Sequence, residues 1–252
     1  MTAGDYVLAT PMKEILLLSD VHANYPALKA VGESLDLDRF DTIINAGDIT
    51  VYGTFPNESI HWFKDLGERA INIVGNTDRR ILRLLKGKKM KKPRIQEKRI
   101  MYEWTCENLS GASIDFLRSL RKKNKFRVGG FDLGIFHGSA EKPNAQVFPT
   151  SPLSRFVQLA GKGSYDIHIM GHSHVPFHKI INGVHFINPG SVGRMFDGDP
   201  RASYAILRIK SGQCRIEHFR VAYKVDDVVK GLREHNLPDI YGEMFQVGRK
   251  LN

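Results

Sequence analysis

The sequence predicts an α/β fold in which two mixed β-sheets pack face to face and helices cover the outside. From residue 14 onward, short β-branched or leucine-rich runs alternate with amphipathic segments of helix length. Near the end, SYAILRIK (203–210) and CRIEHFRVAY (214–223) alternate around the turn SGQ, as antiparallel strands do. Strand–helix alternation together with a terminal hairpin implies a two-sheet sandwich.

Six further strands are expected, each ending in a small residue. They are EILLLS (14–19), DTIINAG (41–47), AINIVG (70–75), DLGIFHG (132–138), DIHIMG (166–171) and HFINPG (185–190). Helices are expected between them at 26–35, at 57–66 with Asn57 as N-cap, and from Ser151 as N-cap with Pro152 in the first position. In this last helix, Leu153, Phe156, Val157 and Ala160 share one face, which we expect to be core.

The remaining helical segments define the domain organisation. Segments at about 96–109 and 113–121 form a helical insertion, bounded at about 80–124, between the third and fourth strands. Another helix runs from Asp226, with Val228, Val229 and Leu232 on its inner face. Because no repeat, linker or low-complexity tract interrupts the chain, we expect residues 1–252 to form a single domain.

Composition excludes several classes of protein. The chain has 252 residues, of which 42% are hydrophobic, enough for a sizeable core. No run approaches a membrane span, and no signal peptide is found. Cys106 and Cys214 lie far apart without a Cys-x-x-Cys motif, so neither a disulfide framework nor a thiolate metal site is indicated. We expect a cytoplasmic protein without membrane contact, and a homo-oligomer stays open.

The positive charge of the chain is concentrated in one segment. Residues 86–99, KGKKMKKPRIQEKR, hold eight Lys or Arg and one Glu, or +7 of the net +10. Such a run is either a solvated loop or a patch that draws anionic substrates toward a nearby site. Because it lacks aromatic residues for base stacking, a nucleic-acid partner is not favoured.

Polar residues that suit metal binding follow the predicted strands, each just past a strand end. They are Asp20, His22, Asp48, Asn76, His137, His172 and His174. Strand ends of this kind meet at one rim of an α/β sheet. Carboxylate, imidazole and amide donors together favour Mn²⁺, Fe or Zn²⁺ over Mg²⁺. Seven groups exceed one tetrahedral site, so two ions bridged by a carboxylate are predicted, about 3.5–4 Å apart.

The order of these motifs resembles a known family. DVH (20–22), GD (47–48), GNTD (75–78), HG (137–138) and GHSH (171–174) are similar to the motifs of the calcineurin-like metallophosphoesterase superfamily, over most of the chain. GDITVYGTFPNE, NPGSVG and DGDPRASYAIL resemble a bacterial and archaeal subgroup of small phosphodiesterases and phosphatases. The resemblance implies that one ion is bound by Asp20, His22, Asp48 and His174, and the other by Asp48, Asn76, His137 and His172. Asp48 would bridge, while His168 and His178 are expected to be structural.

The resemblance also implies the reaction. A hydroxide bridging two ions, Mn²⁺ first and Fe, Zn²⁺, Ni²⁺ or Co²⁺ as alternatives, would hydrolyse a small phosphodiester or phosphomonoester of nucleotide type. No protein nucleophile is needed, and no Gly-x-Ser-x-Gly elbow, Cys–His signature or Walker loop is found. The GSVG loop at 190–193 is either a phosphate-binding loop or a simple turn.

One position departs from the family pattern. The expected catalytic set is Asp48, Asn76, Thr77 and Asp78, but many relatives carry histidine where this chain has Thr77. Threonine is a poor general acid at neutral pH, so the leaving group must take its proton from Asp78, another group or water. Acidic leaving groups, as in aryl phosphates, cyclic phosphodiesters and phosphoanhydrides, are therefore favoured. In the nearby loops, Tyr52, Phe55, Phe148 and Arg194 either contact a base or sugar or simply pack.

Two other functions compete with this one. The first is a nuclease that uses the basic segment to hold a nucleic-acid backbone, which salt sensitivity on long polymers would reveal. The second is a protein-binding scaffold that has lost catalysis. All seven ligand positions carry coordinating residue types, which argues against a scaffold, whereas Thr77 argues for one.

Overall fold

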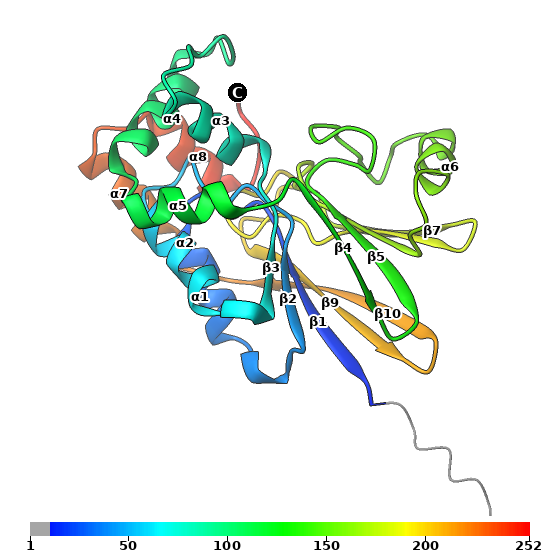
Figure 1. Cartoon of the computed structure of the whole chain (residues 1–252). Helices are drawn as coiled ribbons and strands as arrows, with labels where there is room; N and C mark the ends of the chain where they lie inside the picture. Colours follow the sequence, from blue (N-terminus) through cyan, green and yellow to red (C-terminus); the bar gives the residue numbers. More distant parts are fainter. Residues whose placement is uncertain (1–10) are drawn as a thin grey trace, which may run out of the picture.

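Two mixed sheets form the centre of the molecule, as predicted, and each has five strands (Figure 1). The computed structural model describes residues 11–252. In the first sheet the order is β10 (Gln213–Val221), β9 (Ala202–Lys210), β1 (Lys13–Leu18), β2 (Thr42–Asn45) and β3 (Ala70–Asn72). In the second it is β4 (Lys123–Val128), β5 (Phe131–Phe136), β6 (Ile167–Met170), β8 (Val184–Asn188) and β7 (Phe177–Ile181). In the first sheet β1, β2 and β3 are parallel, with β3 at the edge, and β9 and β10 are antiparallel additions on the other side. In the second sheet the three central strands β5, β6 and β8 are parallel, and both edge strands are antiparallel.

Helices cover both outer faces unequally (Figure 1). The helices that pack against the first sheet are α1 (Tyr25–Glu33), α2 (Pro56–Asp65), α3 (Asn76–Leu84), α4 (Gln96–Asn108), α5 (Gly111–Ser119), α7 (Val225–Glu234) and α8 (Asp239–Val247). Of the helices in residues 11–252, only α6 (Leu153–Ala160) covers the second sheet. Two short 3₁₀ turns, Leu37–Arg39 and Gly67–Arg69, precede β2 and β3. No helix within residues 11–252 is long and apolar enough to cross a membrane.

The molecule has four layers, two sheets with helices on either side, and the strands contribute side chains to the cores on both of their faces. Alternate side chains of a strand point to opposite faces, and in β1 Leu16 and Leu18 pack against the helices whereas Ile15 and Leu17 pack against the second sheet. In β6 and its neighbours, the inward residues meet β1, and Met170 packs toward α6. Both faces of each central strand are therefore buried, which accounts for the near-continuous apolar runs in the sequence.

Two predicted helix starts are wrong. Helix α2 begins at Pro56 with Phe55 as N-cap, because proline suits the first helical position. The predicted cap, Asn57, instead bonds with its side chain to the backbone of Asn108 and Ser110, which ties α2 to the α4–α5 connection. Helix α6 begins at Leu153, and the Ser151 hydroxyl accepts from the Phe148 amide, not from the helix.

The expected apolar stripe of α6 is only partly core. Phe156 and Leu159 are buried, but Leu153 is 63% exposed and Val157 is 44% exposed. Helix α6 lies alone on its sheet, so it buries one narrow face and leaves its flanks in solvent. By contrast, Val228, Val229 and Leu232 of α7 are buried as predicted, because α8 and α1 enclose that helix.

Four elements were not predicted from the sequence: β4, β7, α3 and α8. Strand β4, KNKFRV, is rich in charge because it is an edge strand with one exposed face, and charged edges are protected against further pairing. Helices α4 and α5 occupy the predicted helical segments at 96–108 and 111–119, next to α3.

Candidate metal centre

The loops that follow β1, β2, β5 and β6 meet at one rim between the two sheets. Backbone hydrogen bonds join them: the Asp20 amide donates to the Gly47 carbonyl at 2.9 Å, and the Gly171 amide donates to the His137 carbonyl at 2.9 Å. The ends of parallel strands from both sheets thus deliver all seven predicted residues, with Asn76 at the start of α3, to one place.

The backbone of these loops is unusual. Among residues 11–252, eleven non-glycine residues have left-handed φ angles, and eight of them lie in the rim loops, including Asp20, Asp48 and His172. This conformation is costly for residues with a side chain, and it persists only where the surroundings enforce it. The loops are therefore built to aim these side chains inward.

The first group consists of Asp20, His22 and His174, all buried. The Nε2 atoms of the two histidines lie 3.2 Å apart, and Asp20 Oδ1 lies 3.3 Å from His174 Nε2 and 3.8 Å from His22 Nε2. Asp20 Oδ2 accepts from the Ser19 hydroxyl at 2.6 Å and from the His172 amide at 2.9 Å. Its other oxygen, Oδ1, is buried without a hydrogen-bond partner.

The second group consists of Asp48, His137 and His172, with Asn76 beside it. His137 Nε2 lies 3.3 Å from Asp48 Oδ2 and 2.9 Å from Asn76 Oδ1. The His137 and His172 rings lie with centroids 4.9 Å apart.

Asp48 lies between the two groups. Its Oδ1 accepts from the Thr77 amide at 2.8 Å, which fixes the carboxylate. Its Oδ2 points to both groups, 3.3 Å from His137 Nε2 and 3.9 Å from His22 Nε2. This is the position that a bridging carboxylate requires.

Burial and charge set the protonation of these groups. Burial, reinforced by the His174 ring, lowers the pKa of His22 to about 3, so it is neutral at pH 7. Burial opposes the charged form of His137, but the Asp48 carboxylate outweighs it and raises the pKa of His137 to about 9. Although burial favours the neutral form of Asp48, the nearby His137 holds its pKa well below the usual range. The carboxylate is therefore ionised at neutral pH.

These residues fit divalent metal ions. The Nδ1 atoms of His22, His137 and His174 each face a backbone carbonyl, those of Thr50, Ala46 and Arg194. A carbonyl can only accept, so each Nδ1 carries a hydrogen. In the neutral ring of His22 or His174 the lone pair is therefore on Nε2, whereas His137 must first lose its Nε2 proton. Two such lone pairs, on His22 and His174, face each other beside the unpartnered Asp20 Oδ1. A cation would satisfy all three atoms, and histidine ligands are commonly oriented in this way.

The side chains of Thr77 and Asp78 do not point toward the two groups of metal-binding residues. The Thr77 hydroxyl donates to the Thr50 carbonyl at 3.3 Å. Both oxygens of buried Asp78 are occupied: Oδ1 accepts from the Thr50 hydroxyl and amide at 2.7 and 3.0 Å, and Oδ2 from the amides of Gly75 and Ile49 at 3.0 and 3.3 Å. This arrangement favours a positioning role for Asp78 over proton delivery, because it joins the Asp48 loop to the start of α3.

The other rim residues named from the sequence make contacts within the protein. In the GSVG loop, the amides of Gly190, Val192 and Gly193 donate to Asn188 Oδ1 and to the carbonyls of Ser19 and Asp20, which leaves none of the three for a phosphate. The guanidinium of Arg194 lies over the Tyr52 ring, 3.8 Å from its centroid, and is 6% exposed. Phe55 caps α2, and the Phe148 amide donates to Ser151.

His168 and His178 stay outside the metal-binding groups. The His168 ring packs among Phe136, Tyr165 and Phe186 with centroid distances of 5.5, 5.4 and 4.9 Å. His178 stacks on His185, with Nε2 3.0 Å from the His185 Nδ1. Both therefore contact partners other than the rim residues.

Two positioning residues were missed from the sequence. The Ser19 hydroxyl holds Asp20, and the Asn188 side chain donates to the Gly171 carbonyl and the Ser173 hydroxyl, both at 2.9 Å. Asn188 begins the NPGSVG segment, so its place directly after a strand was an available signal.

Known proteins share this fold and sequence pattern. Residues 12–212 match the family model described as the calcineurin-like phosphoesterase superfamily domain. The Methanocaldococcus jannaschii protein MJ0912 is 29% identical over 250 residues, covering 93% of this chain and 98% of its own. A metallophosphoesterase structure from Sphaerobacter thermophilus aligns with TM-score 0.78 at 27% identity, over 94% of this chain and 100% of that chain. The Pyrococcus horikoshii protein PH1004 is similar in fold, with TM-score 0.84 at 18% identity, over 94% and 99%.

Proposed function

The chain belongs to the calcineurin-like phosphoesterase superfamily and is a metal-dependent phosphoesterase, and on this premise we propose that it uses two divalent metal ions to hydrolyse a small phosphodiester or phosphomonoester of nucleotide type. The observation that carries this proposal is the Asp48 carboxylate, whose Oδ2 approaches a histidine of each group. The first ion would be held by Asp20, His22, Asp48 and His174, and the second by Asp48, Asn76, His137 and His172.

The donor set supports Mn²⁺ first, with Fe, Zn²⁺, Ni²⁺ or Co²⁺ as alternatives, because it mixes imidazole with carboxylate and amide oxygen. When bound, two such ions lower the pKa of a water toward 7 and offset the charge of the phosphoryl oxygens. The protein supplies the geometry: Ser19, the His172 amide and the Thr77 amide fix the carboxylates, while backbone carbonyls fix the histidines. We place the activity in the cytoplasm, an assignment that the two free cysteines support.

Chelation and metal add-back test this function. The purified protein would be stripped of metal, analysed for its elements, and then assayed with added Mn²⁺ on p-nitrophenyl phosphate, bis-p-nitrophenyl phosphate and cyclic nucleotides. We expect activity to vanish on chelation and to return with about two metal equivalents per chain. Folded, metal-loaded protein that hydrolyses none of these compounds would contradict the proposal.

Metal affinity is expected to rise with pH. In the metal-free protein the pKa of His137 is raised to about 9, so this ring is protonated at pH 7 and must lose the Nε2 proton when a metal binds. Affinity should therefore increase about tenfold per pH unit below that pKa and level off above it. Calorimetry in two buffers of different ionisation enthalpy would detect about one released proton at pH 7. His137→Gln should abolish this proton release, whereas the control His61→Gln, on the exposed surface of α2, should keep it. Equal binding heats in both buffers for the native chain would show that metal binding does not release a proton.

Replacing Thr77 by histidine should improve hydrolysis of alkyl phosphates. A general acid contributes about 10²–10⁴-fold, so we expect the ratio of kcat/KM for alkyl against aryl phosphates to rise about tenfold or more. Thr77→Val is the matched control, because it removes the hydroxyl that donates to Thr50 and keeps the volume, and it should leave the ratio unchanged. If Thr77→His retains both metals and the native ratio, a missing acid does not limit this enzyme.

A further inference from the structure

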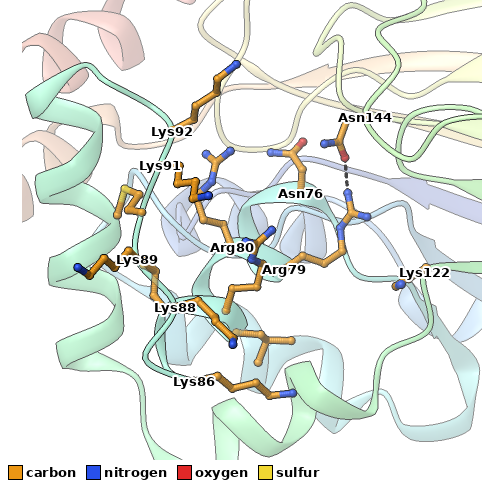
Figure 2. Close-up of a pocket in the computed structure, with 14 residues that line it drawn as sticks. Asn76, Arg79, Arg80, Lys86, Lys88, Lys89, Lys91, Lys92, Lys122 and Asn144 are labelled. Carbon is orange, nitrogen blue, oxygen red and sulfur yellow. Dashed lines mark hydrogen bonds between the residues drawn. The ribbon is translucent and has the colours of Figure 1, made fainter.

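A pocket of high positive charge includes Asn76, a residue of the metal centre, in its lining (Figure 2). This cationic pocket has a volume of about 820 Å³ and is lined by fourteen residues, nine of which are lysine or arginine. Three are the arginines of α3, five are lysines between residues 86 and 92, and the last is Lys122. No aspartate or glutamate lines it.

The cations of the pocket have no acidic partner in the described part of the chain. Within residues 11–252, none of the nine forms an ion pair. Arg79 and Arg80 are nevertheless held in place: Arg79 donates to the Gly75 carbonyl and to the Asn144 side chain, and Arg80 donates to the Tyr102 hydroxyl at 2.9 Å. Burial lowers the pKa of Arg79. Two held arginines are thus surrounded by exposed lysines, and unpaired cations gathered in a concavity focus the electrostatic field on an anion.

The pocket adjoins the metal centre at Asn76. This residue lines the pocket, and its Oδ1 lies 2.9 Å from His137 Nε2 of the second group. Asn76 and Arg79 stand three positions apart on α3, hence on neighbouring parts of one helix face. Figure 2 shows Arg79 and Asn144 beside Asn76, with the lysines of residues 86–92 on the other side of the pocket. If a phosphoryl group lies at the metal centre, the part of the substrate bonded to it can therefore reach the cations of the pocket.

The lining favours a compact polyanion. Its apolar members are Leu82, Leu84 and Met90, and no aromatic ring is present on which a nucleic-acid base would stack. The volume is that of a small-molecule site. Nine cations in this space match a ligand that carries several charges on few atoms, which describes a phosphoanhydride chain better than a nucleic-acid backbone.

We propose that the cationic pocket binds the polyphosphate chain of the substrate while its scissile phosphoryl group lies at the metal centre. The inference rests on the proposed function. In the reaction, a water oxygen bonds to the phosphorus at the metals, the anhydride P–O bond breaks, and the departing phosphate keeps the electron pair. The water proton passes to solvent or product. A phosphate leaving group is acidic and lies among cations, so it departs without the general acid that Thr77 fails to provide.

Binding to metal-free protein tests the pocket apart from catalysis. Calorimetry at low ionic strength would measure the Kd of inorganic tripolyphosphate for the native chain and for Lys88→Glu/Lys89→Glu/Lys91→Glu/Lys92→Glu. We expect the Kd to rise about tenfold or more in this variant. The matched control reverses four lysines outside the pocket (Lys64, Lys210, Lys224 and Lys230) and should stay close to native. Equal affinity in both variants overturns the proposal.

Steady-state kinetics then test the proposed function and the role of the cationic pocket separately. If metal-loaded native protein hydrolyses neither p-nitrophenyl phosphate nor tripolyphosphate, the proposed function fails. If it hydrolyses p-nitrophenyl phosphate, and the pocket variant keeps the native kcat/KM for tripolyphosphate, only the pocket assignment fails. The proposal is supported if the pocket variant loses kcat/KM for tripolyphosphate or adenosine triphosphate but keeps the native kcat/KM for p-nitrophenyl phosphate. Of tripolyphosphate and adenosine triphosphate, the one with the higher kcat/KM then shows whether the natural chain is free or linked to a nucleoside. Tighter binding of a single-stranded oligonucleotide, lost in the pocket variant, would overturn the proposal in favour of nucleic acid.

Discussion

Replacing Asp48 by asparagine is expected to lower phosphoesterase activity roughly a thousandfold or more, equivalent to about 4 kcal/mol in the activation barrier. Asp48 Oδ2 approaches both His22 and His137, so in the proposed two-metal site its negative charge would serve both groups at once. Asparagine has nearly the same shape, and its carbonyl oxygen can still accept from the Thr77 amide. The loop should therefore persist while the bound metal falls below two equivalents per chain.

Elemental analysis, circular dichroism and kcat would be measured on the same preparation. Asp38→Asn is the matched control, because the Asp38 side chain is 89% exposed and should tolerate loss of its charge. Retention of two metals and native kcat by Asp48→Asn would show that this carboxylate does not join the two groups. Loss of metal in both variants would point to a general effect of charge instead.

The rim residues could be predicted because strand ends are visible in the sequence. Each of Asp20, Asp48 and His137 follows a short apolar run, and the carboxyl ends of parallel strands converge. Their division into two groups could not be derived from spacing, since His174 joins Asp20 across 154 positions while His172, two residues away, joins Asp48. That division came from the family resemblance, and it reflects left-handed turns that no local pattern specifies.

The cationic pocket shows the same limit. The sequence revealed the basic segment at 86–99 but not its partners, because α3 was not predicted and its three arginines therefore had no assigned face. Lys122 joins them from a position just before β4. The two faces of α6 were misjudged for a related reason: periodicity shows which residues share a face, but only the packing of neighbouring elements shows how wide the buried part is.

Gly75→Ala is expected to damage the site from the backbone side. A Cβ atom at residue 75 would lie 2.0 Å from Asp48 Oδ1 and 2.2 Å from the Asp48 backbone nitrogen, closer than non-bonded heavy atoms approach in proteins. The φ of Gly75 is −83°, which alanine adopts without strain, so the cost is purely this collision. Overpacking of this kind costs about 1–3 kcal/mol in the free energy of unfolding. A misplacement near 1 Å can lower the rate about 100-fold, so a substantial loss of kcat is expected.

Gly111→Ala separates the collision from a general effect of glycine replacement. Gly111 opens α5, and a Cβ atom there meets no heavy atom within 4 Å. Alanine should leave stability unchanged or raise it by about 0.4–1 kcal/mol by restricting the unfolded chain. Urea unfolding with and without Mn²⁺ would measure both effects. Mn²⁺ should stabilise the native chain and Gly111→Ala equally. It should stabilise Gly75→Ala far less, because the displaced Asp48 could no longer serve both groups. Equal stabilisation of all three proteins would mean that the Gly75–Asp48 contact does not shape the site.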